Sequence, residues 1–335
     1  MIKNLRIQNF RRHADFKMSF SDSITIITGK NGSGKTSIIE AIFIALSGKS
    51  WRSNFNEILR DGSAEWWRVD VEFIGGEKRV VKFINNQKIF EIDDKRFMRL
   101  PARLKKPVIL FEPNDLQLLY GSPTRRRDFF DRFITQIEPE HQINLNKFAR
   151  VLKQRNNLLK RGTSLDELMV WDLQFADLAE KIVAAREKWI AEIDENLAAE
   201  YRMIADKNDE ISIKYSGVSK NKAQTLKLLQ SFFLEGWLTT KIGPQLHDIK
   251  FRINGHDAKL TASRGENRTI IFAILATMTR LLNQKFGEKV YLIFDDIDSE
   301  LDLKHKNGLY NLEIFRENYL FATTIKSDMS TLNLE

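Results

Sequence analysis

The sequence predicts an α/β fold in which a mixed β-sheet surrounds a central helix and a mainly α-helical arm is inserted into the chain. Short apolar strand patterns fill the first part, and one of them leads through a glycine-rich loop, residues 29–36, into a helix with regular apolar spacing. Helical periodicity then continues from residue 113 to about 201, after which strand patterns return. We therefore expect a split α/β lobe, residues 1–112 and 205–335, around an arm lobe, residues 113–204.

The individual elements follow from local patterns. Apolar–polar alternation and short β-branched or apolar runs predict strands at residues 2–10, 15–20, 23–28, 66–73, 78–84, 88–92, 108–111, 211–215, 249–253, 289–294 and 318–324. Glycine and proline near residues 121–123, 138–140 and 162–164 break the long helical region into successive helices. Later helices are predicted at residues 268–282 and 304–315.

The stretch from Gly29 to Thr36 fits the pattern Gly-x4-Gly-Lys-Ser/Thr at every position. Backbone N–H groups of such a loop can wrap phosphates, and the start of the following helix favours negative charge. Lys35 can then reach the β- and γ-phosphates, and the Thr36 hydroxyl can bind Mg²⁺. We therefore expect ATP and Mg²⁺ here. The predicted nucleotide-binding residues of the loop are Gly29, Lys30, Asn31, Gly32, Ser33, Gly34, Lys35 and Thr36.

Composition excludes several other classes of protein. The chain has 335 residues and no cysteine, which excludes disulfides and thiolate metal sites and suits a reducing cytoplasm. No stretch reaches the roughly 20 apolar residues of a membrane span, and the N-terminus lacks the apolar core of a signal peptide. We expect a cytoplasmic protein with no membrane partner. The net charge of +8 permits a polyanionic partner without requiring one.

Basic residues are concentrated in the first half of the arm. Between His141 and Arg161 the sequence contains Lys and Arg at helical spacing and no acidic residue. Such side chains bind DNA phosphates without regard to base sequence, although a solvated helix face gives the same pattern. A cluster of three arginines precedes this segment. The candidate DNA-binding residues are Arg125, Arg126, Arg127, Lys147, Arg150 and Lys153.

Two aspartates follow the apolar run from Tyr291 to Phe294. A carboxylate at the tip of a buried strand is costly unless it is paired, and Mg²⁺ at the phosphate loop offers a partner. We assign Asp295 to the metal. Asp296, which points the other way, is assigned with Lys35 to catalysis, because it can accept a proton from the attacking water or position it. The alternative is that the aspartates cap a helix.

Ser263, Arg264 and Gly265 stand at the start of a predicted helix and form a second candidate anion site. The chain has no second phosphate-binding loop, and therefore no second nucleotide of its own to occupy this site. Two copies facing head to tail would solve this, because each could lend its Ser263 loop to the γ-phosphate bound at the other's Lys35. Taken alone, the three residues also fit an ordinary helix cap and turn.

In combination these motifs resemble the ABC-type ATPase heads of the SMC-like family, over nearly the whole chain. The resemblance implies an ABC-type head with a P-loop helix and an inserted arm. Arg11 takes the place of a basic residue against the nucleotide, and Ser299 and Asp302 that of the D-loop. The further matching segments are residues 9–11, 51–53, 111–116, 121–123, 125–131, 152–156, 243–244 and 299–302.

The branch of the family that this chain resembles implies a role in recombination, DNA replication and the SOS response to DNA damage. It implies a weak, DNA-stimulated ATPase that forms an ATP-dependent homodimer on double-stranded DNA and at junctions of double and single strand. It also implies partners of the RecR and RecO mediator type and recombinase loading at gaps. Two alternatives stay open: an ATP-gated structural DNA clamp of another SMC-like type, and a P-loop small-molecule kinase.

The chain departs from the pattern of the family at four places. Glu266 stands where glutamine is common, so cross-dimer ATP sensing is expected to be weaker, and Gln245 stands where histidine is usual. Asp296 is one methylene shorter than the usual glutamate, so slow hydrolysis is expected. No glutamine near Phe111 supplies the Mg²⁺ contact that other ABC proteins place at the arm boundary.

Overall fold

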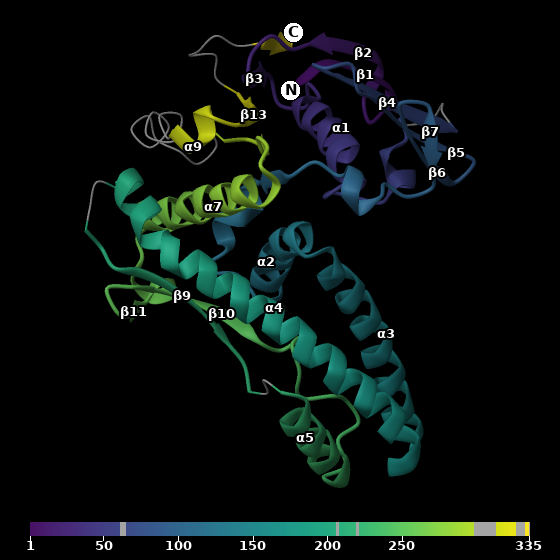
Figure 1. Cartoon of the computed structure of the whole chain (residues 1–335), viewed down its shortest axis with the longest axis vertical. Coiled ribbons are helices and arrows are strands. Elements are labelled where there is room, and N and C mark those ends of the chain that lie inside the picture. The colour runs from purple at the N-terminus through teal and green to yellow at the C-terminus, as the bar shows by residue number, and fades with distance from the viewer. Residues whose placement is uncertain (61–64, 206–207, 219–220, 298–312, 326–331, 335) are drawn as a thin grey trace. The chain divides into compact units, whose positions relative to one another are not determined.

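The fold is that of a computed structural model, which describes residues 1–60, 65–205, 208–218, 221–297, 313–325 and 332–334. Its internal contacts divide the chain into two compact units. Unit 1 comprises Met1–Pro113 and Thr279–Glu335, and unit 2 comprises Asn114–Met278 (Figure 1). The first division lies close to the predicted boundary after residue 112. The described part of residues 205–278, predicted to belong to the α/β lobe, is grouped with the helices in unit 2. The predicted lobe boundaries stay a prediction.

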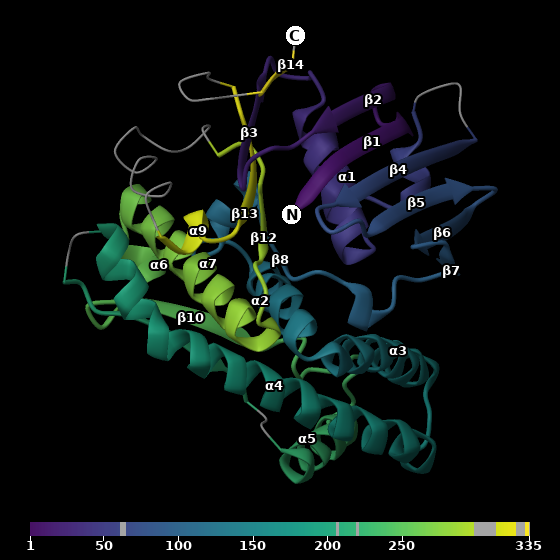
Figure 2. The same cartoon turned by 45° about the horizontal axis from the view of Figure 1, so that its top comes forward.

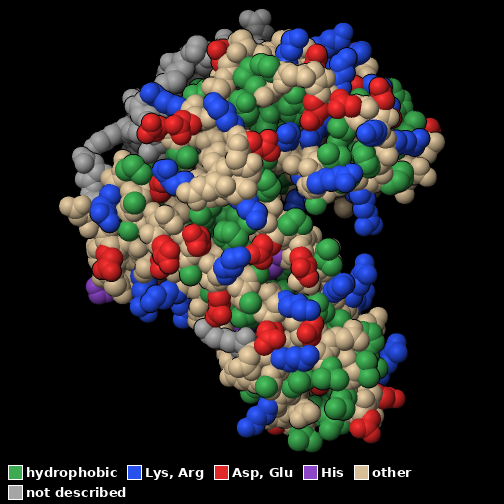
Figure 3. Space-filling view, viewed as in Figure 1, with side chains coloured by type: hydrophobic (Ala, Val, Ile, Leu, Met, Phe, Trp, Pro, Cys, Tyr) green, Lys and Arg blue, Asp and Glu red, His purple; other side chains and the backbone are tan. Residues whose placement is uncertain are grey.

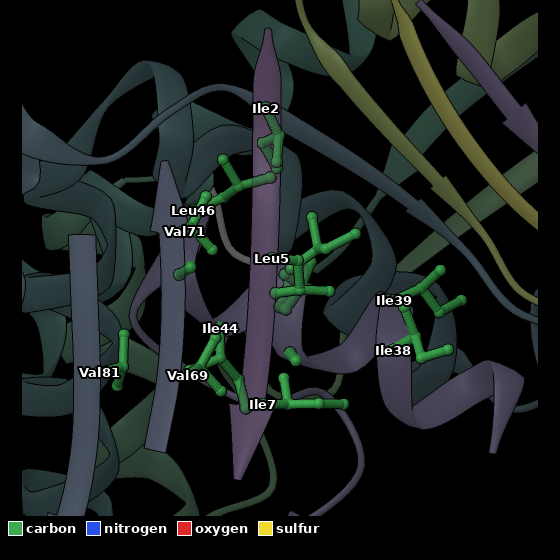
Figure 4. Close-up of a cluster of buried hydrophobic side chains, with 14 of the residues drawn as sticks. Ile2, Leu5, Ile7, Ile38, Ile39, Ile44, Leu46, Val69, Val71 and Val81 are labelled. Carbon is green, nitrogen blue, oxygen red and sulfur yellow. The ribbon is translucent and has the colours of Figure 1, made fainter. Parts of the chain in front are cut away.

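Unit 1 contains an antiparallel sheet in the order β2-β1-β4-β5-β6-β7. Its strands are β1 (Ile2–Phe10), β2 (His13–Ser19), β4 (Trp66–Phe73), β5 (Lys78–Ile84), β6 (Gln87–Ile92) and β7 (Lys95–Phe97). Alternation in the sequence gives this sheet one buried face, since every second residue of β4 is buried from Trp67 to Phe73. That face packs on helix α1 (Lys35–Ser47), where Ile38 and Ile44 join the core (Figure 4).

The second sheet of unit 1 is parallel in every pairing, in the order β14-β3-β13-β12-β8 (Figure 2). Its strands are β3 (Ile24–Gly29), β8 (Val108–Phe111), β12 (Tyr291–Phe294), β13 (Tyr319–Thr324) and β14 (Leu332–Leu334). All four residues of β8 and of β12 are buried, as their apolar sequences predict. Because the strands are parallel, Gly29 at the end of β3 and Asp295 directly after β12 lie at the same edge of the sheet.

Unit 2 is mainly helical. It contains α2 (Pro123–Ile137), α3 (Pro139–Arg161), α4 (Leu165–Ala205), α5 (Lys222–Leu234) and α6 (Ala258–Thr261), and α7 (Arg264–Phe286) begins in it. The breaks between α2, α3 and α4 fall at the predicted positions. A small antiparallel sheet, in the order β11-β10-β9, packs on α4; its strands are β9 (Ile211–Ser216), β10 (Asp248–Ile253) and β11 (His256–Asp257). The predicted α/β class with inserted helices is confirmed.

Short elements complete the described fold. They are the 3-10 helices η1 (Phe55–Ile58), η2 (Ala102–Leu104) and η3 (Pro113–Gln117), and helix α9 (Glu313–Arg316). Most of the helix predicted at residues 304–315 lies outside the described residues, as do Ser299 and Asp302. In the part of the chain that the structure describes, no helix combines the length and apolarity needed to cross a membrane.

Candidate nucleotide-binding site

The phosphate loop joins β3 to α1, as predicted, and its shape depends on glycine. Gly34 caps the start of α1 with φ 98°, a left-handed conformation that costs most residues free energy. There is also no room for a side chain, because a Cβ at this position would collide with the imidazole of His13 and lie 2.9 Å from Cδ of Arg12. The loop therefore packs closely against the turn between β1 and β2.

A pocket of about 430 Å³ opens over the loop, entirely within unit 1. Of the predicted loop residues, Asn31, Gly32, Gly34, Lys35 and Thr36 line it, whereas Gly29, Lys30 and Ser33 do not. Its other charged lining residues are Arg11, Arg12, Arg52, Asp295 and Asp296. Four basic side chains around one pocket favour a polyanionic ligand.

The ammonium of Lys35 is held by the loop itself. Its Nζ donates to the carbonyl oxygens of Gly29, at 2.7 Å, and Lys30, at 3.1 Å. These contacts keep the charge near the mouth of the pocket. A phosphate oxygen would offer Nζ a charged acceptor, which binds about twice as strongly as a neutral carbonyl.

Thr36 and Asp295 meet directly although 259 positions separate them in the chain. The Thr36 hydroxyl donates to Oδ1 of Asp295 at 2.9 Å, and the Thr323 hydroxyl donates to the same oxygen at 2.7 Å. The backbone N–H of Asp295 donates to Phe111 O on β8 at 2.9 Å. A hydroxyl and a carboxylate oxygen this close form a pair of hard oxygen ligands, the type that Mg²⁺ binds together with water and phosphate. The donor set therefore fits the predicted metal.

Asp296 adopts φ 47°, in the left-handed region that is rare for residues other than glycine, asparagine and aspartate. Its backbone N–H donates to the Thr323 hydroxyl at 2.8 Å, and its side chain lines the pocket. Such conformations persist only where the surrounding structure holds them, and they concentrate at functional sites. Both aspartates line the pocket, and Asp295 also accepts the Thr36 hydroxyl.

Two neighbouring arginines divide their tasks. Arg11 donates to both carboxylate oxygens of Glu40, which is 0% exposed, and also to Ser53 and to the carbonyl of Glu57. Its guanidinium is thus engaged within the protein, and its contact with nucleotide stays a prediction. Arg12 makes no ion pair with the described residues, and its Nη1 lies 3.6 Å from where a Gly32 Cβ would be. Sequence reasoning missed Arg12, although it directly follows the recognised Arg11.

The chain around Ser263, which we call the serine loop, leads into helix α7 of unit 2. Ser263 is exposed, and its hydroxyl accepts the backbone N–H of Glu266 at 3.2 Å. In return, Oε2 of Glu266 accepts the backbone N–H of Ser263 at 2.8 Å. This reciprocal pair is a capping box, which satisfies two N–H groups at the helix start. The structure thus contains the helix cap that was one of the two alternatives, and the cross-dimer role stays a prediction.

The three clustered arginines do not share one environment. Arg126 and Arg127 are only 6% and 8% exposed. Arg126 forms a bidentate ion pair with Asp248, and Arg127 donates to the carbonyl of His247 at 2.6 Å. Both arginines are held by partners within this fold, and their contact with DNA stays a prediction. Arg125 is half-buried.

The predicted basic segment of α3 does lie on the surface. Lys147, Arg150 and Lys153 are exposed and make no ion pair with the described residues. The buried residues of α3, which include Phe148 and Val151, face the core of unit 2. Figure 3 shows Lys and Arg side chains along the edge where α3 lies in that view. The DNA-binding assignment of the six candidates stays a prediction, and these three are the ones whose side chains are exposed.

The fold and the pocket define a P-loop ATPase with a head of the SMC-like type. The AAA domain family matches residues 4–232, and a solved Smc head bound to the C-terminal winged-helix domain of ScpA aligns over 97% of this chain with TM-score 0.54 and 16% identity. A second comparison is more specific. The chain is 30% identical to the DNA replication and repair protein RecF of Ruminiclostridium cellulolyticum, over 96% of this chain and 92% of that protein.

Further relatives agree. RecF of Lachnoclostridium phytofermentans is 31% identical, over 92% of this chain and 89% of its own length. The solved structure of the recombination mediator protein RecF-ATPrS in the RecFOR pathway aligns with TM-score 0.86 and 25% identity, covering 98% of this chain and 93% of that one. The chain belongs to the RecF family of DNA replication and repair proteins.

Proposed function

We propose that this chain is an ATP-dependent DNA-binding protein of recombinational repair and replication restart. The hydrogen bond between Thr36 and Asp295 carries the proposal, because it joins the phosphate loop to the end of β12 beside the pocket. Relatives of this chain have been solved as RecF-ATP and RecF-ATPrS. ATP is accordingly the nucleotide that we assign to the pocket.

The residues around the pocket have separate tasks in this proposal. Loop N–H groups and Lys35 bind the phosphates, and Arg12 adds a cation that the protein itself leaves unpaired among the described residues. Thr36 Oγ1 and Asp295 Oδ1 would hold Mg²⁺, which neutralises charge on the phosphates when bound. Asp296 accepts a proton from the attacking water or orients it. Its short side chain is expected to make hydrolysis slow.

The dimer is the second part of the proposal. Ser263, Arg264 and Gly265 of one copy would meet the γ-phosphate held by Lys35 of the other, in a head-to-tail arrangement. The exposure of Ser263 supports this role, since a buried serine could not reach a second chain. Ser299 and Asp302 are proposed to border the same interface on the basis of family resemblance.

DNA binding is assigned to the exposed basic side chains of α3 and to the half-buried Arg125. Two copies would bring two sets of Arg125, Lys147, Arg150 and Lys153 together, and cations at a protein surface can bind phosphates. The related solved structures belong to the RecFOR pathway. We therefore propose mediator partners of the RecR and RecO type, action at gaps and junctions in the cytoplasm, and weak DNA-stimulated ATP hydrolysis that helps the recombinase to load.

Gel filtration and DNA-binding assays with and without ATP test this proposal in Lys35→Arg and Ser263→Arg variants. The wild-type protein should dimerise with ATP and bind DNA more tightly, and both variants should stay monomeric. Only Ser263→Arg should retain affinity for ATP, because its own pocket is intact. Normal dimerisation of Ser263→Arg would exclude the cross-dimer role of that loop. If the chain is a small-molecule kinase, its oligomeric state in gel filtration should not depend on ATP. If it is a purely structural clamp, DNA should not stimulate its ATP turnover.

A further inference from the structure

The serine loop of unit 2 is tied to a second segment that is distant in the chain. The segment runs from Asn114 to Gly121 and precedes α2. The hydroxyl of Tyr120 donates to the carbonyl of Ala262, the residue directly before Ser263, at 2.8 Å. Tyr120 is 40% exposed, so this bond, and not burial of the ring, accounts for where the hydroxyl lies.

A second bond ties the other side of the same loop. The side-chain amide of Asn267 donates to the carbonyl of Leu116 at 2.8 Å, and Asn267 is 5% exposed. The backbone N–H of Asn267 also donates to the carbonyl of Ser263 at 2.9 Å. The loop is therefore held at residue 262 and at residue 267 by one and the same segment.

The segment itself is firmly anchored. The guanidinium of Arg126, which is buried, donates to the carbonyls of Leu118, Leu119 and Gly121 while it pairs with Asp248. Arg132 pairs at 2.9 Å with Asp115, which is 2% exposed. A buried, multiply bonded cation fixes the backbone that it binds, because releasing any of these acceptors would leave buried polar groups unsatisfied. The Tyr120 backbone is thus a fixed point from which a side chain can hold another loop.

We propose that Tyr120 is a positioning residue that holds the Ser263 loop in the geometry required to meet the nucleotide of a second copy. This role rests on the proposed head-to-tail dimer. The capping box with Glu266 sets the direction of the first turn of α7. The Tyr120 bond fixes the position of the backbone at Ala262, directly before Ser263. Preorganised contacts raise affinity, because the loop then loses less conformational freedom when it binds.

Tyr120→Phe tests the role by removing one exposed hydroxyl, so the fold should survive. Tyr215→Phe is the control, because Tyr215 lies in the same unit and is half-buried, and its hydroxyl lies 2.8 Å from Nδ1 of His247 instead of at the serine loop. Hydrogen exchange of the amides around residues 262–267 should become faster in Tyr120→Phe and not in the control. The dissociation constant of the ATP-bound dimer should rise about ten-fold, since loss of the hydrogen bond that positions the loop costs roughly a factor of three at each of the two symmetric nucleotide sites. Affinity of the monomer for ATP should not change.

The outcomes separate the inference from the proposed function. Unchanged hydrogen exchange in Tyr120→Phe would exclude the positioning role without any reference to the dimer. Faster exchange with normal dimerisation would show that the position of the loop does not govern assembly. If the wild-type protein itself fails to dimerise with ATP, the proposed function falls, and hydrogen exchange alone decides whether Tyr120 holds the loop.

Discussion

Thr36 at the start of α1 and Asp295 at the end of β12 share a hydrogen bond of 2.9 Å within the phosphate-loop pocket. Parallel pairing of β3 with β13 and of β13 with β12 brings the two chain segments to one sheet edge. This contact joins the two halves of the proposed metal site.

Thr36→Val should weaken Mg²⁺-dependent ATP binding roughly ten- to a hundred-fold, because it removes a hydroxyl that bonds to a charged group. Titration with a fluorescent ATP analogue, with Mg²⁺ and with EDTA, measures the effect. Thr323→Val is the comparison, since its hydroxyl supports Asp295 from the side of β13. Equal losses with Mg²⁺ and with EDTA would contradict a metal contact by Thr36.

Asp296→Asn should lower ATP turnover at least a hundred-fold and leave an ATP-bound dimer in place. Asparagine tolerates the φ of 47° found here, so the turn should survive the exchange. Phosphate release and gel filtration measure the two properties separately. Unchanged turnover would remove Asp296 from the catalytic assignment.

Glu40→Gln should lower the free energy of unfolding by about 3 kcal/mol, because it removes the charge that compensates Arg11 inside the protein. Urea denaturation followed by circular dichroism measures the change. Glu57→Gln is the matched control on an exposed carboxylate, and it should change stability by less than about 1 kcal/mol. Equal effects of the two variants would show that the Arg11–Glu40 pair contributes little.

Removing all three exposed cations Lys147, Arg150 and Lys153 should reduce the salt dependence of duplex binding. The slope of log affinity against log salt falls by about 0.9 for each lost phosphate contact, so a decrease of about 2 to 3 is expected. Arg126→Met also removes one positive charge, but it should destabilise the protein instead, because Asp248 loses its buried partner. An unchanged slope in the triple variant would place the DNA elsewhere.

Asp131 should make stability depend on acid pH. Burial alone would raise the pKa of this carboxyl, but hydrogen bonds from Arg186 and His141 outweigh it, and the pKa lies below its usual value. The unfolded chain then binds the proton more readily, so the stabilisation is complete above about pH 4 and is lost as the pH falls through the folded-state pKa. Unfolding free energies of wild type and Asp131→Asn should therefore converge on acidification. A constant difference from pH 7 to pH 3 would contradict this.

Much of the fold could be predicted because its signals are local. The alternation of β4 and β5 gave their observed bounds, and the apolar run of β8 did the same. The phosphate loop and Asp295 could be placed at one sheet edge because both follow buried parallel strands. Helix α5 carried no comparably regular apolar pattern and was not predicted.

Other features depend on partners that are remote in the chain. The sequence of three consecutive arginines does not indicate which of them are buried. The partner of Arg126 is Asp248, which lies 122 positions away in the chain. Arg11 has φ 53° at the turn after β1, which changes the direction of the chain before Arg12. No periodicity reports such a turn, so the division of tasks between the two arginines emerged only in three dimensions.

The carboxylate of Glu266 already accepts a hydrogen bond from the backbone N–H of Ser263, just before α7. Any anion from outside that seeks the same N–H must first displace this side chain, so its arrival would be a substitution and not a simple addition. The net free energy of binding is then only the difference between the hydrogen bond of the incoming anion and the hydrogen bond of Glu266 that it replaces. In a Glu266→Gln variant the side chain on this N–H would be neutral, so an incoming anion would displace it more easily.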